Sequence, residues 1–173
     1  MKTIETDRLI LRHFKEDDAE EMFLNWTQDP EVTKYMTWNP HQSIDETKYI
    51  LNIWIKEYEN PNTIRFGITL KSSGELIGGI DVVEMIDNKP VIGYCLSKKY
   101  WNQGIMTEAC TALIRYIFSL GYKEILISAV DKNIGSNRVI QKCGFVFTHQ
   151  VTEPMSSLKP NEIVTINWYK LEK

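Results

Sequence analysis

The 173-residue chain has the length of a single domain, and its 43% hydrophobic and 25% charged residues are typical of a globular protein. A formal net charge of −3 argues against a nucleic-acid surface as the main partner, and no apolar run approaches the roughly 20 residues that span a membrane. The polar N-terminus lacks the apolar region of a signal peptide, and three cysteines without a close pair favour a reducing compartment. We therefore expect one cytoplasmic domain over residues 1–173.

The first half of the chain alternates between strand-like and helix-like segments. An acidic segment after the first strand favours a helix, because negative charge stabilises the start of a helix. Ser43 and Glu46 form a capping box, which predicts the start of a longer helix with one apolar face. In chain order, the predicted elements are a strand at 9–14, a helix at 17–27, a helix at 43–58, and strands at 64–70, 76–85 and 91–96.

The second half begins with a clear helix at residues 105–120, which has apolar side chains at core spacing and ends at Gly121. Residues 152–161 carry two prolines and two serines, and we expect them to form the most mobile loop. The other elements are a strand at 124–130, a short helix ending at Gly144, and strands at 145–151 and 163–171. Together they predict an α/β fold with a mixed central sheet, an antiparallel meander followed by a βαβ crossover, with flanking helices.

The segment at residues 100–109 joins the strand ending at Leu96 to the helix that starts at Ile105. A turn at Gly104 opens this helix, and no good capping residue precedes it. Its unpaired backbone N–H groups and the positive end of the helix dipole form a site for an anion such as a phosphate. One glycine is a weak motif, so a simple βα turn is the alternative interpretation.

A second segment, residues 133–145, follows the strand at 124–130. The two segments together resemble the cofactor motifs of the GCN5-related N-acetyltransferase (GNAT) superfamily. The first motif binds the pyrophosphate of acetyl-coenzyme A (acetyl-CoA), and the second lines its pantetheine arm. Residues 5–12 resemble the opening strand of the ribosomal-protein (RimJ/RimL-type) branch, which acetylates protein N-termini. The resemblance runs from about residue 4 to residue 171 in the family's order, and it implies one N-acetyltransferase domain with a GNAT-type sheet.

The resemblance also implies where acetyl-CoA binds as a co-substrate. The strands ending at Leu96 and Val130 should splay, so that pantetheine enters between them. Trp101 and Met106 depart from the motif, which has Arg or Gln and then Gly or Ala at these positions. The loss of one side-chain phosphate ligand leaves more of the binding to backbone amides. The expected coenzyme-binding residues are Tyr94, Cys95, Leu96, Trp101, Asn102, Gln103, Gly104, Ile105, Met106, Thr107, Asn133 and Ser136.

Positive side chains near these segments are Lys98, Lys99, Arg138 and Lys142. They either neutralise coenzyme phosphates or are solvated surface charges. No His/Cys cluster has the spacing of a zinc site, so no metal is implied. A Cys–His nucleophile is not favoured either, because no pattern places Cys95 beside a histidine.

The reaction implied by the family is direct attack of a neutral amine on the thioester in a ternary complex. Ser136 lies where the branch has a serine proposed as the acid for the departing thiolate; the alternative is that Ser136 is a helix N-cap. Val91 stands where many relatives carry a carboxylate, which leaves Asp81 and Glu84 as candidate bases. Alternation along a strand places these two on opposite faces, so at most one should face the acyl group.

The most favoured acceptor is a protein or peptide N-terminal α-amine. The alternatives are a small amine such as an aminoglycoside, polyamine or amino acid, and a non-catalytic module that only binds acyl-CoA. Residues 38–41 and the loop at 152–161 are expected to wall the acceptor cleft, and the protein should be a monomer or a homodimer.

Overall fold

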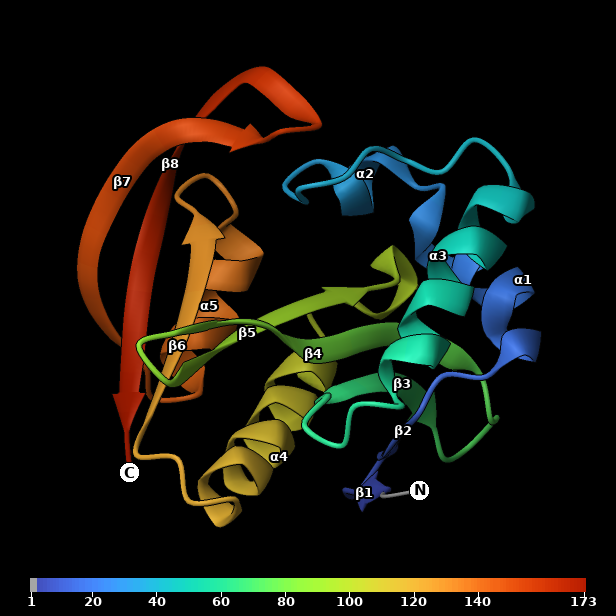
Figure 1. Cartoon of the computed structure of the whole chain (residues 1–173), viewed down its shortest axis with the longest axis horizontal. Helices are drawn as coiled ribbons and strands as arrows, with labels where there is room; N and C mark the ends of the chain where they lie inside the picture. The colour runs from blue at the N-terminus through green and yellow to red at the C-terminus, as the bar shows by residue number, and fades with distance from the viewer. Residues whose placement is uncertain (1–2) are drawn as a thin grey trace.

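The computed structural model describes residues 3–173, which form one eight-stranded sheet flanked by helices (Figure 1). The strand order is β1-β2-β3-β4-β5-β6-β8-β7. The strands are β1 (Ile4–Glu5), β2 (Leu9–Arg12), β3 (Arg65–Leu70), β4 (Leu76–Ile86), β5 (Lys89–Leu96), β6 (Glu124–Val130), β7 (Val146–Ser156) and β8 (Lys159–Glu172). The α-helices are α1 (Ala19–Met22), α2 (Pro30–Thr33), α3 (Ile44–Glu57), α4 (Ile105–Ser119) and α5 (Ile134–Lys142).

The sheet is mixed, as the sequence predicts. Strands β1 to β5 form an antiparallel meander, β5 and β6 are parallel and joined through α4, and β6, β8 and β7 are again antiparallel. Helix α4 packs on one face through residues such as Leu113 and Ile117, while Trp26 and Leu51 belong to a second core on the other face. Strands β5 and β6 run in clearly different directions toward their carboxyl ends (Figure 1).

The predicted N-terminal helix at 17–27 is divided into three short pieces. A 3-10 turn, η1 (Glu16–Asp18), precedes α1, and a π-helical segment, η2 (Phe23–Thr27), follows it. The longer helix begins as predicted, because the Ser43 hydroxyl accepts a hydrogen bond from the Glu46 amide at 3.3 Å. The Glu46 carboxylate accepts from the Gln42 amide rather than from Ser43, so the second half of the capping box is displaced by one residue.

Residues 152–161 do not form the loop that the sequence predicted. Strand β7 continues to Ser156 and β8 begins at Lys159, so these residues form the tip of a long hairpin. Pro154 is tolerated because β7 is the outermost strand of the sheet, where an amide hydrogen bond is not needed on the open side. The tip is anchored to the α2 region by Lys159 Nζ, which donates to the Thr33 carbonyl at 3.0 Å.

Among residues 3–173, no helix is long and apolar enough to cross a membrane. The same residues contain no group of three or more His, Cys, Asp or Glu side chains placed to hold a metal ion.

Candidate active site

Strands β5 and β6 separate at their carboxyl ends. Their parallel pairing is limited to Val91 with Leu126 and Ile92 with Ile127, although β5 continues to Leu96 and β6 to Val130. The backbone groups beyond the paired residues are therefore open to a ligand, as the splay implied by the resemblance requires.

Two cavities meet at this opening. The helix cavity, of about 580 Å³, lies at the amino end of α4 and along α5, and is lined by residues that include Trp101, Gly104 and Arg138. The strand cavity, of about 490 Å³, is lined mainly by β4, β5, β6 and β8. The residues that line both are Tyr35, Met36, Tyr94, Cys95, Asn133 and Ser136. A ligand in one cavity can thus reach a ligand in the other.

The helix cavity has the backbone geometry of an anion site. Gly104, at the start of α4, has φ 75° and provides no side-chain cap, so the first amides of the helix are left unpaired. Asn102 also has a positive φ, of 59°, which shapes the loop before the helix. The Trp101 indole Nε1 donates to the Leu96 carbonyl at 2.8 Å, so this side chain secures the end of β5. All the expected coenzyme-binding residues line the helix cavity except Gln103.

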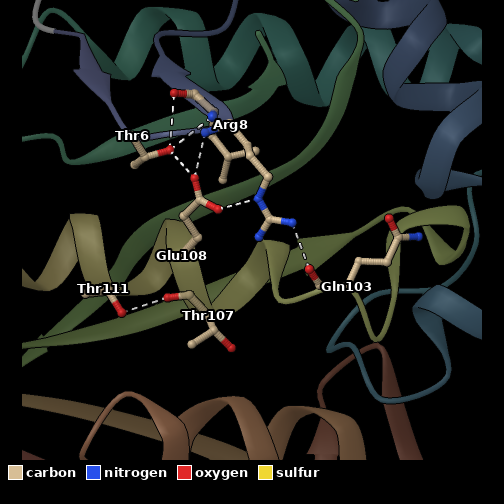
Figure 2. A network of polar contacts seen from close by, with 7 residues as sticks. Thr6, Arg8, Gln103, Thr107, Glu108 and Thr111 are labelled. Carbon is tan, nitrogen blue, oxygen red and sulfur yellow. Dashed lines mark hydrogen bonds and ion pairs between the residues drawn. The ribbon is translucent and has the colours of Figure 1, made fainter. Parts of the chain in front are cut away.

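Arg8 and Glu108 hold the α4 loop from the side opposite the helix cavity (Figure 2), and no motif in the sequence indicated a role for either residue. Arg8 Nε pairs with Glu108 Oε2 at 2.7 Å, and Arg8 Nη1 donates to the Gln103 carbonyl at 2.9 Å. Thr6 Oγ1 donates to Glu108 Oε1 at 2.6 Å. Thr6 and Arg8 belong to the opening-strand pattern, but a pattern in one segment cannot identify a partner about a hundred residues away.

The four candidate phosphate-binding cations fall into two pairs. Lys98 forms an ion pair with Glu31, and Lys99 lies 3.7 Å from a Glu75 carboxylate oxygen. Arg138 and Lys142 lie one turn apart on α5, line the helix cavity, and form no ion pair with any residue in the described part of the chain. The α5 pair is therefore the one available to an anionic ligand.

Ser136 lies at the junction of the two cavities and is not a helix cap. Asn133 Oδ1 accepts from the Ser136 amide at 3.2 Å, so Asn133 caps α5 and the alternative interpretation of Ser136 is wrong. The Ser136 hydroxyl lies 2.9 Å from the Tyr94 hydroxyl, which also donates to the Ser136 carbonyl at 3.3 Å. Burial raises the pKa of Tyr94, and the hydrogen bond with Ser136 opposes this only in part, so the phenol remains protonated at neutral pH.

Asp81 and Glu84 lie on the same face of β4, which corrects the expectation of opposite faces. A bulge between Val82 and Glu84 adds one residue to β4, so Asp81 is opposite Gly93 while Glu84 is opposite Val91. Both carboxylates line the strand cavity. Glu84 thus lies directly across from the position where relatives carry an acid.

The two carboxylates have different surroundings. Asp81 Oδ2 accepts from Arg65 Nε at 2.9 Å, and burial raises the pKa of Asp81 while the charge of Arg65 opposes that shift. Glu84 is exposed and forms no ion pair within residues 3–173. Asp81 is therefore tied to a structural pair, and Glu84 is the one of the two without an ion-pair partner among the described residues.

The walls of the strand cavity combine aromatic rings with carboxylates. The carboxylates in the lining are Asp81, Glu84 and Glu153 of β7. Arg65, the cation of this lining, already forms ion pairs with Asp81 and Glu57. The aromatic lining residues are Phe14, Tyr35, Trp38, Trp54, Tyr94 and Trp168. Such walls favour an amine attached to an apolar group and disfavour a free carboxylate.

The expected walls of the acceptor cleft are only partly present in this cavity. Trp38 lines it, but residues 39–41 do not; of residues 152–161, Glu153 and Met155 line it. Cys95 lines both cavities, yet burial raises the pKa of its thiol to about 12, which keeps it protonated and unreactive. A covalent cysteine intermediate is therefore disfavoured by the site itself.

Comparisons with known proteins agree with this geometry. The sequence model of the acetyltransferase (GNAT) domain family matches residues 8–146. The chain is 33% identical over 145 residues to the uncharacterized N-acetyltransferase YoaA of Bacillus subtilis, and the match covers 82% of this chain and 81% of YoaA. It is 30% identical over 148 residues to the uncharacterized N-acetyltransferase p20 of Bacillus licheniformis, and this match covers 84% of this chain and 83% of p20.

The fold is also found in solved structures. RimL, a ribosomal L7/L12 α-N-protein acetyltransferase in complex with coenzyme A, superposes with a TM-score of 0.83. That likeness covers 99% of this chain and 98% of the RimL chain, at 20% sequence identity. At this level of identity, the likeness describes the fold.

Proposed function

The chain belongs to the GNAT family of acetyltransferases and is an acetyl-CoA-dependent N-acetyltransferase, and on this premise we propose that its acceptor is the α-amine of a protein or peptide N-terminus. The observation that carries the proposal is the meeting of the two cavities at Tyr94 and Ser136. The helix cavity suits a long anionic thioester, and the strand cavity suits an uncharged amine with an apolar neighbour.

Acetyl-CoA is proposed to lie in the helix cavity with its pantetheine arm between β5 and β6. Backbone amides of residues 102–107 face the pyrophosphate, and the cations of α5 are near the remaining phosphate. The thioester then reaches the junction near Cys95, where unpaired backbone amides of β5 can donate to its carbonyl oxygen.

The acceptor amine enters through the strand cavity and attacks the thioester carbon as a neutral nucleophile. A C–N bond forms, the carbonyl becomes an oxyanion, and its collapse breaks the C–S bond. Ser136 donates its hydroxyl proton to the departing sulfur. The Tyr94 hydroxyl turns its one proton from the Ser136 carbonyl to Ser136 Oγ and stabilises the developing negative charge on it. Glu84, directly or through water, takes the proton that the new ammonium loses.

Charge in the strand cavity separates the alternative acceptors. A free amino acid would bring its carboxylate toward Asp81, Glu84 and Glu153, with Arg65 already paired, so like charges would oppose binding. A peptide N-terminus replaces that carboxylate with a neutral amide. A thiol-release assay across peptides, polyamines, aminoglycosides and free amino acids tests the proposal, and the highest kcat/KM is expected for peptides with an apolar first residue.

A small amine remains the second candidate acceptor, because a cavity of about 490 Å³ also holds such a molecule. The same assay decides between the two, since a polyamine or aminoglycoside preferred over every peptide would reject the α-amine proposal. Release of thiol above the rate without acceptor also excludes a module that only binds acyl-CoA.

The unpaired cations of α5 give a prediction about coenzyme recognition. Replacing both Arg138 and Lys142 by alanine should raise the Kd of acetyl-CoA on the order of tenfold, because two charge-assisted contacts to phosphate are lost. Acetyl-pantetheine, which lacks the phosphates, should bind the variant and the native protein equally. The matched control is the Lys98→Ala, Lys99→Ala double variant, whose cations are already paired with acids. An equal rise in the Kd of acetyl-CoA in the two double variants would reject the assignment of the α5 cations to the coenzyme phosphates.

A further inference from the structure

The loop that opens α4 is held from behind by an ion pair between β2 and α4. Arg8 contacts the loop and the helix at once: Nη1 donates to the Gln103 carbonyl at 2.9 Å, and Nε pairs with Glu108 Oε2 at 2.7 Å. The Arg8 backbone amide donates to Glu108 Oε1 at 2.9 Å, and Thr6 Oγ1 donates to the same oxygen. Figure 2 shows these contacts converging on the Glu108 carboxylate, on the side of the helix that faces Thr6 and Arg8.

The loop itself has no cation to offer a phosphate. Trp101 occupies the position where the motif has Arg or Gln, and its indole is bonded to the Leu96 carbonyl. No residue from 101 to 107 is positively charged. An anion bound there depends on backbone amides, so the shape of the loop determines how well it binds.

The negative charge of Glu108 makes anion binding depend still more on how the loop is held. It lies in the first turn of α4, where a carboxylate competes with a bound phosphate for the positive end of the helix. Burial raises the pKa of Glu108, but hydrogen bonds from Thr6 and Arg8 outweigh it and lower the pKa overall, so the group is charged at neutral pH. Thr107 lines the helix cavity and Glu108 does not, so the anchor directs the carboxylate away from the ligand.

We propose that Arg8 is a positioning residue for acetyl-CoA: it fixes the Gln103 carbonyl and neutralises Glu108, so that the α4 loop presents its amides to the pyrophosphate. Arg8 does not line the helix cavity, so it acts through the loop and not by touching the coenzyme. The inference rests on the proposed placement of the pyrophosphate at this loop.

Arg8→Ala should raise the Kd and the KM for acetyl-CoA about tenfold and leave kcat within about twofold, because the loss is in ground-state binding. Arg8→Lys keeps the charge but cannot bridge Gln103 and Glu108 as a guanidinium does, so it should recover only part of the affinity. Adding Glu108→Gln to Arg8→Ala removes the uncompensated carboxylate and should also recover part of it. Calorimetry gives the Kd, and initial rates give KM and kcat.

The matched control is Lys71→Ala, which breaks an ion pair between Lys71 and Glu5 at 3.0 Å without touching the α4 loop. It should leave the Kd unchanged. A lower Tm for Arg8→Ala with an unaltered Kd would overturn the inference, because the pair would then only stabilise the fold. If the native protein itself did not bind acetyl-CoA, the placement of the coenzyme would fail, which is a different result from equal affinity in native and variant proteins.

Discussion

Gly104→Glu should weaken acetyl-CoA binding on the order of a hundredfold, the largest effect expected from a single change in this protein. Gly104 has φ 75°, a conformation that costs other residues about 1–2 kcal/mol. An added Cβ would lie 3.5 Å from Arg8 Nη2, so the new carboxylate would compete for the guanidinium that anchors the loop. It would also bring negative charge to the helix end that is proposed to hold the pyrophosphate.

Two further variants separate the causes of this loss. Gly104→Ala introduces the strain without the charge, and it should have a clearly smaller effect on the Kd. Gly121→Glu makes the same change at the far end of α4, where φ is 99° and an added Cβ would contact nothing within 4 Å. Titration calorimetry should show native affinity for Gly121→Glu. Native affinity in Gly104→Glu as well would mean that the anion site lies elsewhere.

Ser136→Ala should lower kcat well over tenfold, while the Kd for acetyl-CoA barely changes, because the lost interaction is made only in the transition state. Loss of a helix cap would not explain such a fall in kcat. Asn133, not Ser136, caps α5, so Ser136→Ala should leave stability nearly unchanged and Asn133→Ala should cost about 1 kcal/mol. Thermal unfolding and single-turnover rates on both variants separate the two roles.

Tyr94→Phe tests whether the Tyr94 hydroxyl acts through Ser136. The variant keeps the ring and removes the hydroxyl that lies 2.9 Å from Ser136 Oγ, so kcat should fall less than in Ser136→Ala. In the double variant, the Tyr94 change should add little, because its effect requires the serine. Ser119→Ala, which alters an exposed serine at the end of α4, serves as the control for the serine substitution. Additive losses in the double variant would show that the two hydroxyls act independently.

The arrangement of elements could be read from the sequence wherever local signals were strong. Ser43 and Glu46 located the start of α3, and the apolar spacing after Ile105 located α4. The hairpin tip was missed because its prolines are typical of a loop, and only the outermost position of β7 makes Pro154 acceptable in a strand.

The features of the site that the sequence did not predict depend on contacts between residues far apart in the chain. The bulge after Val82 reverses the alternation that separated Asp81 from Glu84, and nothing in the residues themselves announces it. The pairing of Arg8 with Glu108 joins segments a hundred residues apart in the sequence. The motif segments gave the residues that line the helix cavity, since those residues are local to the two turns, but the partners that orient them required the folded chain.

Transfer to an α-amine, as proposed for this protein, can be tested through the pKa of the acceptor. An N-terminal amine has a pKa of roughly 7.7–8.0, so about a quarter is neutral near pH 7.4, against roughly one in a thousand for lysine. With an exposed carboxylate such as Glu84 as the base, the α-amine is the much easier nucleophile, and the rate should rise with pH and level off near the acceptor's own pKa.

The most direct measurement compares two peptides that have an apolar first residue and a single lysine, one with a free N-terminus and one with the N-terminus already blocked. Thiol release is followed over time, and mass spectrometry locates the acetyl group. We expect acetylation of the free peptide at its α-amine and no reaction of the blocked peptide above the rate without acceptor. Acetylation of the blocked peptide at its lysine, at a rate similar to that of the free peptide, would contradict it.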